Sequence, residues 1–216
     1  MPNSVKRVLK NSVFQTLGAF GITGLNFVQM LGYARILGPE RFGSLVTSQA
    51  QVLVWALLVD LGLTNGLIGA LTAAEGEKSE LSRQGFRAPD LILRVLGLRL
   101  LGAVLGTIGI VVFAYLHANF SGAFNRTQFV QDLSFLPYLY ALALQQTAVA
   151  YATFRHRQGV SVSANLIGAA VTVFLSLYFA WHGADISTLL ISQSWGGLLA
   201  GVMIFSIVGI KHKRSY

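Results

Sequence analysis

Long uninterrupted stretches of apolar residues dominate the pattern of this chain. Six of them have the length of about 20 residues that an α-helix needs to cross a bilayer. Apolar residues occupy all sides of each stretch, which is typical of membrane-spanning helices and not of amphipathic helices on a soluble core. The stretches are too long, and alternate too little, for β-strands. We therefore predict six spans, at residues 13–34, 43–63 (with apolar character continuing to residue 74), 96–116, 133–154, 160–181 and 186–210.

Glycines recur inside the predicted spans at helical spacing. Small residues on one face let two helix backbones approach closely, which is how helices often pack in membranes. We expect three sets of glycines to mark such faces: Gly18, Gly21 and Gly24 in the first span, Gly102, Gly106 and Gly109 in the third, and Gly196, Gly197 and Gly201 in the sixth.

Composition agrees with a lipid environment. The chain of 216 residues is 54% hydrophobic and 11% charged, whereas soluble domains carry about 25% charged residues. A net charge of +8 would suggest nucleic acid if the basic residues formed a soluble face, but here they separate apolar runs. We therefore expect membrane lipid and no nucleic acid as a partner. The absence of cysteine excludes disulfides and cysteine metal sites.

The basic residues also predict the topology. Thirteen of the sixteen lie before the first span, after the last, or in the alternate connections between them, and the other three are Arg35, Arg41 and Arg126. The positive-inside rule then places both termini in the cytoplasm, and an even number of spans agrees with this. The predicted fold is an all-α, polytopic integral membrane protein, with residues 1–216 forming a single six-helix transmembrane bundle.

Polar residues inside the spans are the candidate site, because such groups are costly in lipid and face other helices or a water-filled cavity. In the first span Gln15, Asn26, Gln29 and Tyr33 fall within a narrow arc at 100° per residue. Gln49 and Asp60 are eleven residues apart and share a face of the second predicted span. One interpretation is a hydrophilic lumen, which the stripe in the first span favours. The other is hydrogen bonding that holds the helices together. Later spans add Gln145, Gln146, Asn165 and Gln193.

Asp60 is the only charged residue between Phe42 and Ala74. A carboxylate near the C-terminal end of a helix meets the negative end of the helix dipole and needs a cation. We rank first an ion pair between Asp60 and Arg99, at the start of the third span. In the alternatives, Asp60 reaches water while Arg99 snorkels to the headgroups, or Asp60 carries a proton or sodium ion for coupled transport.

Arg35 lies at the outer end of the first predicted span, in the segment ARILGPERFG, where Gly38 and Pro39 predict a turn. It either snorkels at the interface or binds an anionic head group through its planar guanidinium. No catalytic constellation is visible, the four histidines lack metal-ligand spacing, and there is no nucleotide-binding loop. We therefore expect no enzyme, no catalytic residue, no metal and no cofactor.

Several segments, in this order, resemble the Wzx-like polysaccharide flippases, which export O-antigen and capsule precursors and belong to the multidrug/oligosaccharidyl-lipid/polysaccharide (MOP) superfamily. The most specific part is the turn LGPERFG followed downstream by DLGL. The resemblance covers nearly the whole chain, and the segments that carry it are KNSVFQTLGAFG (10–21), ARILGPERFG (34–43), DLGL (60–63), GLRLLGAVLG (97–106) and FRHRQGVSVSANL (154–166).

The resemblance implies two six-helix lobes around a central cavity, which is often cationic in that family. It also implies transport of undecaprenyl-pyrophosphate-linked oligosaccharides across the bacterial inner membrane by alternating access. It also implies which residues take part. Gln15, Asn26, Gln29 and Asp60 would line or brace the cavity, and Arg35 or Arg99 would meet the pyrophosphate.

The chain has about half the length that the resemblance implies, and it matches the N-terminal lobe only. Because alternating access needs two bundles that move against each other, we expect a fragment, a subunit that pairs as a homodimer or with a second lobe, or a remnant that does not transport. The first functional hypothesis is one lobe of a polysaccharide flippase. The alternatives are a membrane scaffold for polysaccharide biosynthesis and a small MATE-like cation-coupled exporter.

Overall fold

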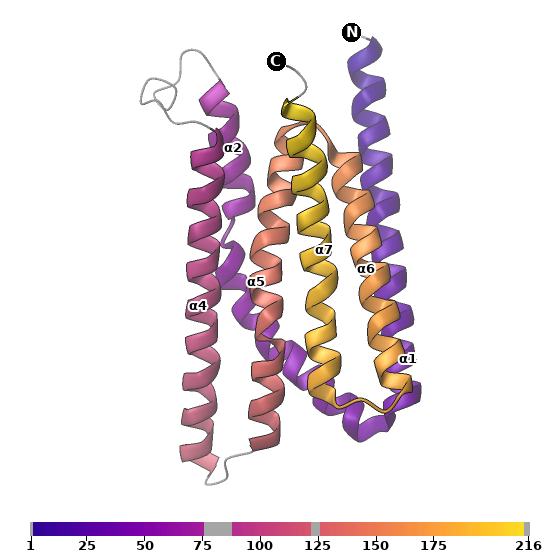
Figure 1. The fold of residues 1–216 in the computed structure, drawn as a ribbon, viewed down its shortest axis with the longest axis vertical. Helices are drawn as coiled ribbons and strands as arrows, with labels where there is room; N and C mark the ends of the chain where they lie inside the picture. The colour runs from indigo at the N-terminus through magenta and orange to yellow at the C-terminus, as the bar shows by residue number, and fades with distance from the viewer. Residues whose placement is uncertain (1, 76–87, 122–125, 214–216) are drawn as a thin grey trace.

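The computed structural model describes residues 2–75, 88–121 and 126–213, which form helices joined by short turns. The helices are α1 (Pro2–Asp60), α2 (Leu63–Glu75), α4 (Ala88–Ser121), α5 (Arg126–Phe154), α6 (Gln158–Trp181) and α7 (Ile186–Lys213). No strand occurs within these residues, so the prediction of an all-α fold is confirmed. Figure 1 shows most of the helices standing side by side along the long axis of the molecule.

Helix α1 consists of two helices that meet at Gly38. The backbone angles of Gly38 are φ 72° and ψ 172°, a region that is essentially restricted to glycine. Pro39 follows and cannot donate a helical hydrogen bond. The chain turns back on itself here (Figure 1), as the sequence predicts. We name residues 2–37 the first arm of α1 and residues 39–60 the second arm.

A second break separates α1 from α2. Leu61 (φ 37°) and Gly62 (φ 78°) both have positive φ, and the chain changes direction here, from the oblique second arm to α2, which runs along the long axis beside α4 (Figure 1). The second predicted span, residues 43–63, therefore differs from the structure at its C-terminal end. Its helix stops at residue 60, and the apolar sequence beyond the break forms α2.

Most of the glycines singled out in the sequence mark close helix contacts. A methyl group added at Gly102 of α4 would collide with the backbone carbonyl of Leu58 in the second arm. One added at Gly196 of α7 would collide with the carbonyl of Gly168 in α6. These pairs bring α4 against the second arm and α7 against α6. Gly24 is an exception, because a methyl group there would meet nothing within 4 Å.

Large apolar side chains cover the outside of the bundle. Phe20, Leu57, Phe174 and Trp181 are each at least 70% exposed, which suits lipid rather than water. Among the residues that the structure describes, four stretches are long and apolar enough to cross a membrane: Val13–Ala74, Pro89–Phe113, Gln158–Trp181 and Ile186–Val208. The first includes the reversal at Gly38, and α5 is not among the four. The structure thus indicates several membrane passes, while the count of six stays a prediction.

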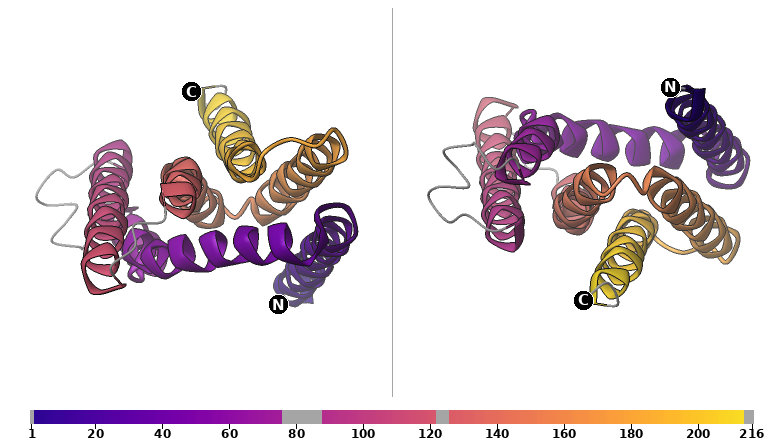
Figure 2. Two further views of the ribbon diagram at one scale, coloured as in Figure 1. Left: turned by 90° about the horizontal axis from the view of Figure 1, so that it is seen from below. Right: turned by 90° about the horizontal axis from the view of Figure 1, so that it is seen from above.

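The arrangement of the helices leaves the two arms of α1 far apart at one end. Both views of Figure 2 place α4 at one edge of the molecule and the first arm at the other, with the second arm running between them. A buried apolar cluster fills the region where both arms approach α5 and α7, and it includes Tyr33, Leu45, Phe135, Leu139 and Leu190. This cluster frames the site described next.

Candidate functional site

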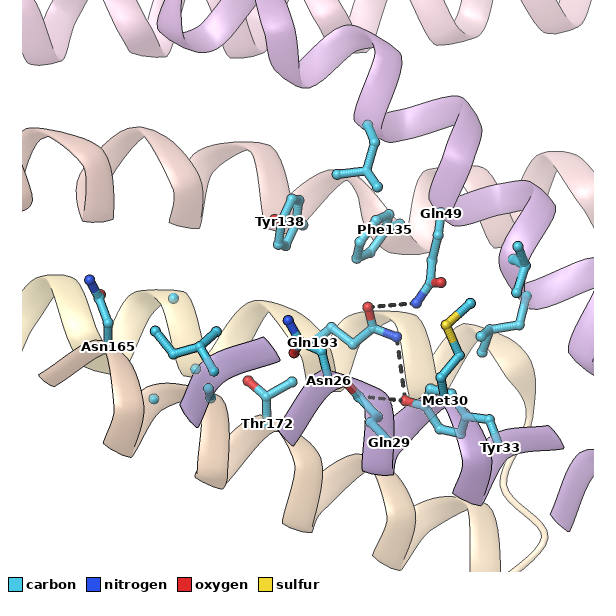
Figure 3. A pocket seen from close by; sticks show the side chains of 18 of the residues that line it. Asn26, Gln29, Met30, Tyr33, Gln49, Phe135, Tyr138, Asn165, Thr172 and Gln193 are labelled. Carbon is cyan, nitrogen blue, oxygen red and sulfur yellow. Dashed lines mark hydrogen bonds between the residues drawn. The ribbon is translucent and has the colours of Figure 1, made fainter. Parts of the chain in front are cut away.

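A cavity of about 390 Å³ lies between the two arms of α1, α5, α6 and α7. Sites for small ligands usually have about 300–1,000 Å³. Figure 3 shows how the polar and aromatic side chains around it are arranged. The side chains that line it and can form hydrogen bonds are Asn26, Gln29, Tyr33, Gln49, Tyr138, Gln145, Asn165, Thr172 and Gln193, and no lining residue is charged.

The first arm supplies three of these groups from one face. Asn26, Gln29 and Tyr33 follow each other at intervals of three and four residues, so they project from one side of the helix. Asn26 is exposed, and Gln29 and Tyr33 are buried. Gln15 belongs to the same predicted stripe, but it is exposed and does not line the cavity. The stripe therefore reaches the cavity only through its C-terminal part.

A chain of hydrogen bonds connects the two arms through Gln193 of α7 (Figure 3). The Gln29 amide donates to the Tyr33 hydroxyl at 3.1 Å and to the Ser176 hydroxyl of α6 at 2.8 Å. The Gln193 amide of α7 donates to the same Tyr33 hydroxyl at 3.3 Å. Gln49 of the second arm then donates to the Gln193 carbonyl at 2.8 Å. These amides thus take part in both of the predicted arrangements, since they bond between helices and line a cavity.

Two aromatic rings of α5 form another side of the cavity. Phe135 and Tyr138 stack with their ring centroids 4.7 Å apart and their planes 17° from parallel, and both point into the cavity in Figure 3. Elsewhere along the lining, the Gln145 amide of α5 donates to the Asn165 carbonyl of α6 at 2.9 Å. The cavity thus combines amide groups with an aromatic surface.

Not all of the lining residues were among the candidates, although the sequence carries a signal for two of them. Tyr138 precedes Gln145 by seven residues, and Thr172 follows Asn165 by seven. Residues seven apart lie on one face of a helix, so each would have joined its polar partner. Phe135 has no such signal, because an apolar ring in a membrane span is ordinary.

Asp60 and Arg99 form the predicted ion pair away from this cavity. The Arg99 guanidinium donates to the Asp60 carboxylate at 2.8 Å, and it also donates to Thr64 at 2.6 Å and to Thr147 at 3.0 Å. The Arg99 side chain has no exposed surface, whereas that of Asp60 is 42% exposed. The ion-pair prediction is confirmed, and snorkelling by Arg99 is wrong because its side chain is enclosed by protein. Neither residue lines the cavity.

Arg35 is exposed and does not line the cavity either. A separate hollow of about 410 Å³ holds the charged groups Arg41, Arg126 and Asp185, and it shares no lining residue with the cavity. There the Arg41 guanidinium donates to the Ala184 carbonyl at 2.8 Å, which ties the α1 reversal to the α6–α7 connection. Of the seven sequence candidates, Asn26, Gln29 and Gln49 come together at the cavity.

Comparison with known proteins connects this architecture to polysaccharide metabolism. The chain is 28% identical over 181 residues to the succinoglycan biosynthesis transport protein ExoT of Rhizobium meliloti (strain 1021). The match takes in 81% of this chain and 33% of that protein, so the chain spans about a third of the curated relative. No solved structure matches.

A family profile gives the broader assignment. The profile described as "Polysaccharide biosynthesis protein" matches residues 8–216, which is nearly the whole chain. This match and the relative together confirm the resemblance to MOP-type polysaccharide flippases, and the relative is named as a transport protein. The chain belongs to the polysaccharide biosynthesis protein family.

Proposed function

We propose that this chain forms one lobe of an exporter that moves lipid-linked polysaccharide precursors across the bacterial inner membrane. Six helical passes, with both termini in the cytoplasm, would place the cavity between helices inside the bilayer. The observation that carries the proposal is the cavity itself, in which nine hydrogen-bonding side chains gather between the helices of a largely apolar bundle. Such groups are costly in lipid and mark substrate pathways in transporters.

Family membership and the curated relative support the same proposal. The family is named for polysaccharide biosynthesis, and the relative is named as a transport protein. The relative is about three times longer than the matched region. Because alternating access requires two bundles that move against each other, the complete transporter would contain a second bundle, from a further lobe or a second copy of this chain.

Complementation in a strain that lacks its own polysaccharide flippase tests the proposal. We expect the chain to restore surface polysaccharide and to lower the accumulated lipid-linked precursor. Gln49→Leu should weaken the rescue, because it removes an amide that lines the cavity and bonds to Gln193. Asn65→Leu is the matched control, since Asn65 is exposed on α2 and does not line the cavity.

Two results would contradict the transport proposal. One is the absence of rescue by a chain that is stably inserted in the membrane and co-expressed with a second lobe, which would favour the scaffold hypothesis. The other is equal rescue by Gln49→Leu and the unchanged chain, which would separate transport from this cavity. A gain of resistance to cationic drugs without any change in polysaccharide would favour the MATE-like exporter.

A further inference from the structure

The cavity lacks the chemistry that an anion requires. Its lining contains amides, hydroxyls, aromatic rings and aliphatic groups, and none of the lining residues is charged. Burying an anion without a counter-charge costs several kcal/mol even after the protein relaxes. This cavity is partly open, so a pyrophosphate or a sugar carboxylate would lose part of its hydration there without gaining a cation from the residues that line it.

The arginines proposed to meet pyrophosphate are not available to this cavity. The Arg99 side chain has no exposed surface, and its guanidinium donates hydrogen bonds to Asp60, Thr64 and Thr147. Arg35 is exposed and outside the lining. The arginines that do border a hollow, Arg41 and Arg126, line the separate one that shares no residue with the cavity.

The groups that are present suit a neutral polyol. A sugar hydroxyl both donates and accepts hydrogen bonds, and so does the side-chain amide of glutamine or asparagine. Asn26 has no hydrogen-bond partner among the described residues and is exposed at the cavity. Gln49 uses one of its two N–H groups on Gln193 and keeps the other. These two amides can bond to a ligand without breaking the network that joins the arms.

The aromatic side of the cavity suits the same class of ligand. The C–H groups on the flat face of a pyranose carry a small positive charge, and the face of an aromatic ring carries a small negative one. The half-buried Tyr138, backed by its stack with Phe135, offers such a face across the cavity from Asn26 and Gln193 (Figure 3). A sugar ring against Tyr138 would direct hydroxyls toward the amides.

We propose that this cavity binds uncharged, hydroxyl-rich sugar residues, and that the anionic part of a precursor is held elsewhere. The proposal rests on the proposed export function and specifies which part of the substrate the cavity takes. It requires discrimination against acidic sugars, which the cavity would accept only at the cost of burying an unpaired charge.

Saturation-transfer difference NMR on the full chain in lipid nanodiscs tests this proposal. The probes are cellotetraose, which is neutral, and the same tetrasaccharide oxidised to its uronic acids. We expect saturation transfer to cellotetraose with an affinity at least ~10-fold higher than that for the acidic probe, since an uncompensated buried charge costs more than 1.4 kcal/mol. Inorganic pyrophosphate should not displace cellotetraose.

Variants at Asn26 locate the binding. Asn26→Leu should weaken cellotetraose binding about fivefold, the equivalent of one lost hydrogen bond of ~1 kcal/mol. Asn65→Leu, the same substitution at an exposed asparagine of α2, should leave binding unchanged. Asn26→Arg should raise binding of the acidic probe, because it supplies the missing cation. Asn26 makes no hydrogen bond within the described structure, so these variants should fold.

The proposal is overturned if cellotetraose shows no saturation transfer, if the acidic probe binds as tightly, if pyrophosphate displaces cellotetraose, or if Asn26→Leu and Asn65→Leu behave alike. These failures leave the export function standing, because complementation measures export whichever part of the precursor occupies the cavity. Conversely, failed complementation with an intact preference for the neutral probe would remove export and keep the neutral-sugar site.

Discussion

The charged side chain of Arg99 has no exposed surface, so the protein must compensate its charge with the groups around it. Asp60 is the only carboxylate within reach among the described residues, and Thr64 and Thr147 supply neutral acceptors. The Nε atom of Arg99 is buried and has no hydrogen-bond partner among the described residues. Hydrogen bonding is thus incomplete, and the charge of Asp60 provides the main compensation.

Asp60→Asn should therefore destabilise the protein, because it leaves a buried cation without a counter-charge. Losing one partner of a fully buried pair costs about 3–5 kcal/mol, and the partial exposure of Asp60 reduces our expectation to roughly 1–3 kcal/mol. Thermal unfolding in nanodiscs measures the effect. Asp185→Asn, at an exposed carboxylate, serves as the control and should change stability little.

A double variant separates charge compensation from loss of contact. Asp60→Asn combined with Arg99→Met removes both charges and fills similar space, so it should recover most of the stability lost in Asp60→Asn. A double variant that is no more stable than Asp60→Asn would show that the ion pair is not what stabilises this region.

For Asp132 of α5, we expect the opposite effect of replacing aspartate by asparagine on stability. Asp132 is 2% exposed and accepts a hydrogen bond of 3.0 Å from Gln128, and no cation lies within 4.0 Å among the described residues. Asp132→Asn should keep or raise the unfolding temperature, because it removes an unpaired buried charge and preserves the shape. A loss as large as that of Asp60→Asn would contradict this expectation and show that the charged carboxylate of Asp132 stabilises the fold.

At the scale of helices, the reversal of α1 depends on one residue. Gly38 adopts φ 72° and ψ 172°, so Gly38→Ala should destabilise the protein by roughly 1–3 kcal/mol. Gly43→Ala is the matched control five residues later, in a helix and with open space around an added methyl group, and it should be neutral or stabilising by up to about 1 kcal/mol. Chemical unfolding of both variants compares them. Equal stability would mean that the turn at Gly38 is not required.

The same elements show how far sequence periodicity leads. The turn at Gly38 and Pro39 is predictable, because both residues break helices for local reasons. The ion pair is predictable from charge alone, because one carboxylate in an apolar run needs a cation. Periodicity also places Gln49 and Asp60 on one face of the second arm, yet Gln49 contacts Gln193 of α7 and Asp60 contacts Arg99 of α4.

Tilt explains that difference and sets the limit of the prediction. The second arm crosses the molecule from the α6–α7 end to α4 (Figure 2), so a single face meets different helices along its length. Close contacts of the second arm with its neighbours, such as that of Leu58 with Gly102 of α4, accompany this tilt. Because such contacts are tertiary, the sequence indicates that polar residues face inward, but not that Gln15 lies beyond the cavity while Tyr138 lines it.

At the scale of the whole molecule, the number of passes decides the topology. The first apolar stretch, Val13–Ala74, is long enough for two passes and contains the Gly38 reversal. No stretch of helix α5 is apolar enough to qualify by hydropathy, and this helix carries Asp132 and several glutamines. The buried side of α5 packs against α7 and the second arm. A polar surface on α5 is therefore compatible with a sixth pass that is enclosed by protein.

Cysteine accessibility tests this topology directly, because the chain has no cysteine of its own and each single substitution reports one position. Glu40 follows the reversal, Asp185 lies between α6 and α7, and His156 lies between α5 and α6, and all three are exposed. Six passes with cytoplasmic termini predict that an impermeant maleimide labels Glu40→Cys and Asp185→Cys in intact spheroplasts, and His156→Cys only after permeabilisation. Labelling of His156→Cys alone in intact spheroplasts would invert the orientation. Labelling of Asp185→Cys but not Glu40→Cys would show that the α1 reversal does not reach the outer face, and the count of six would be wrong.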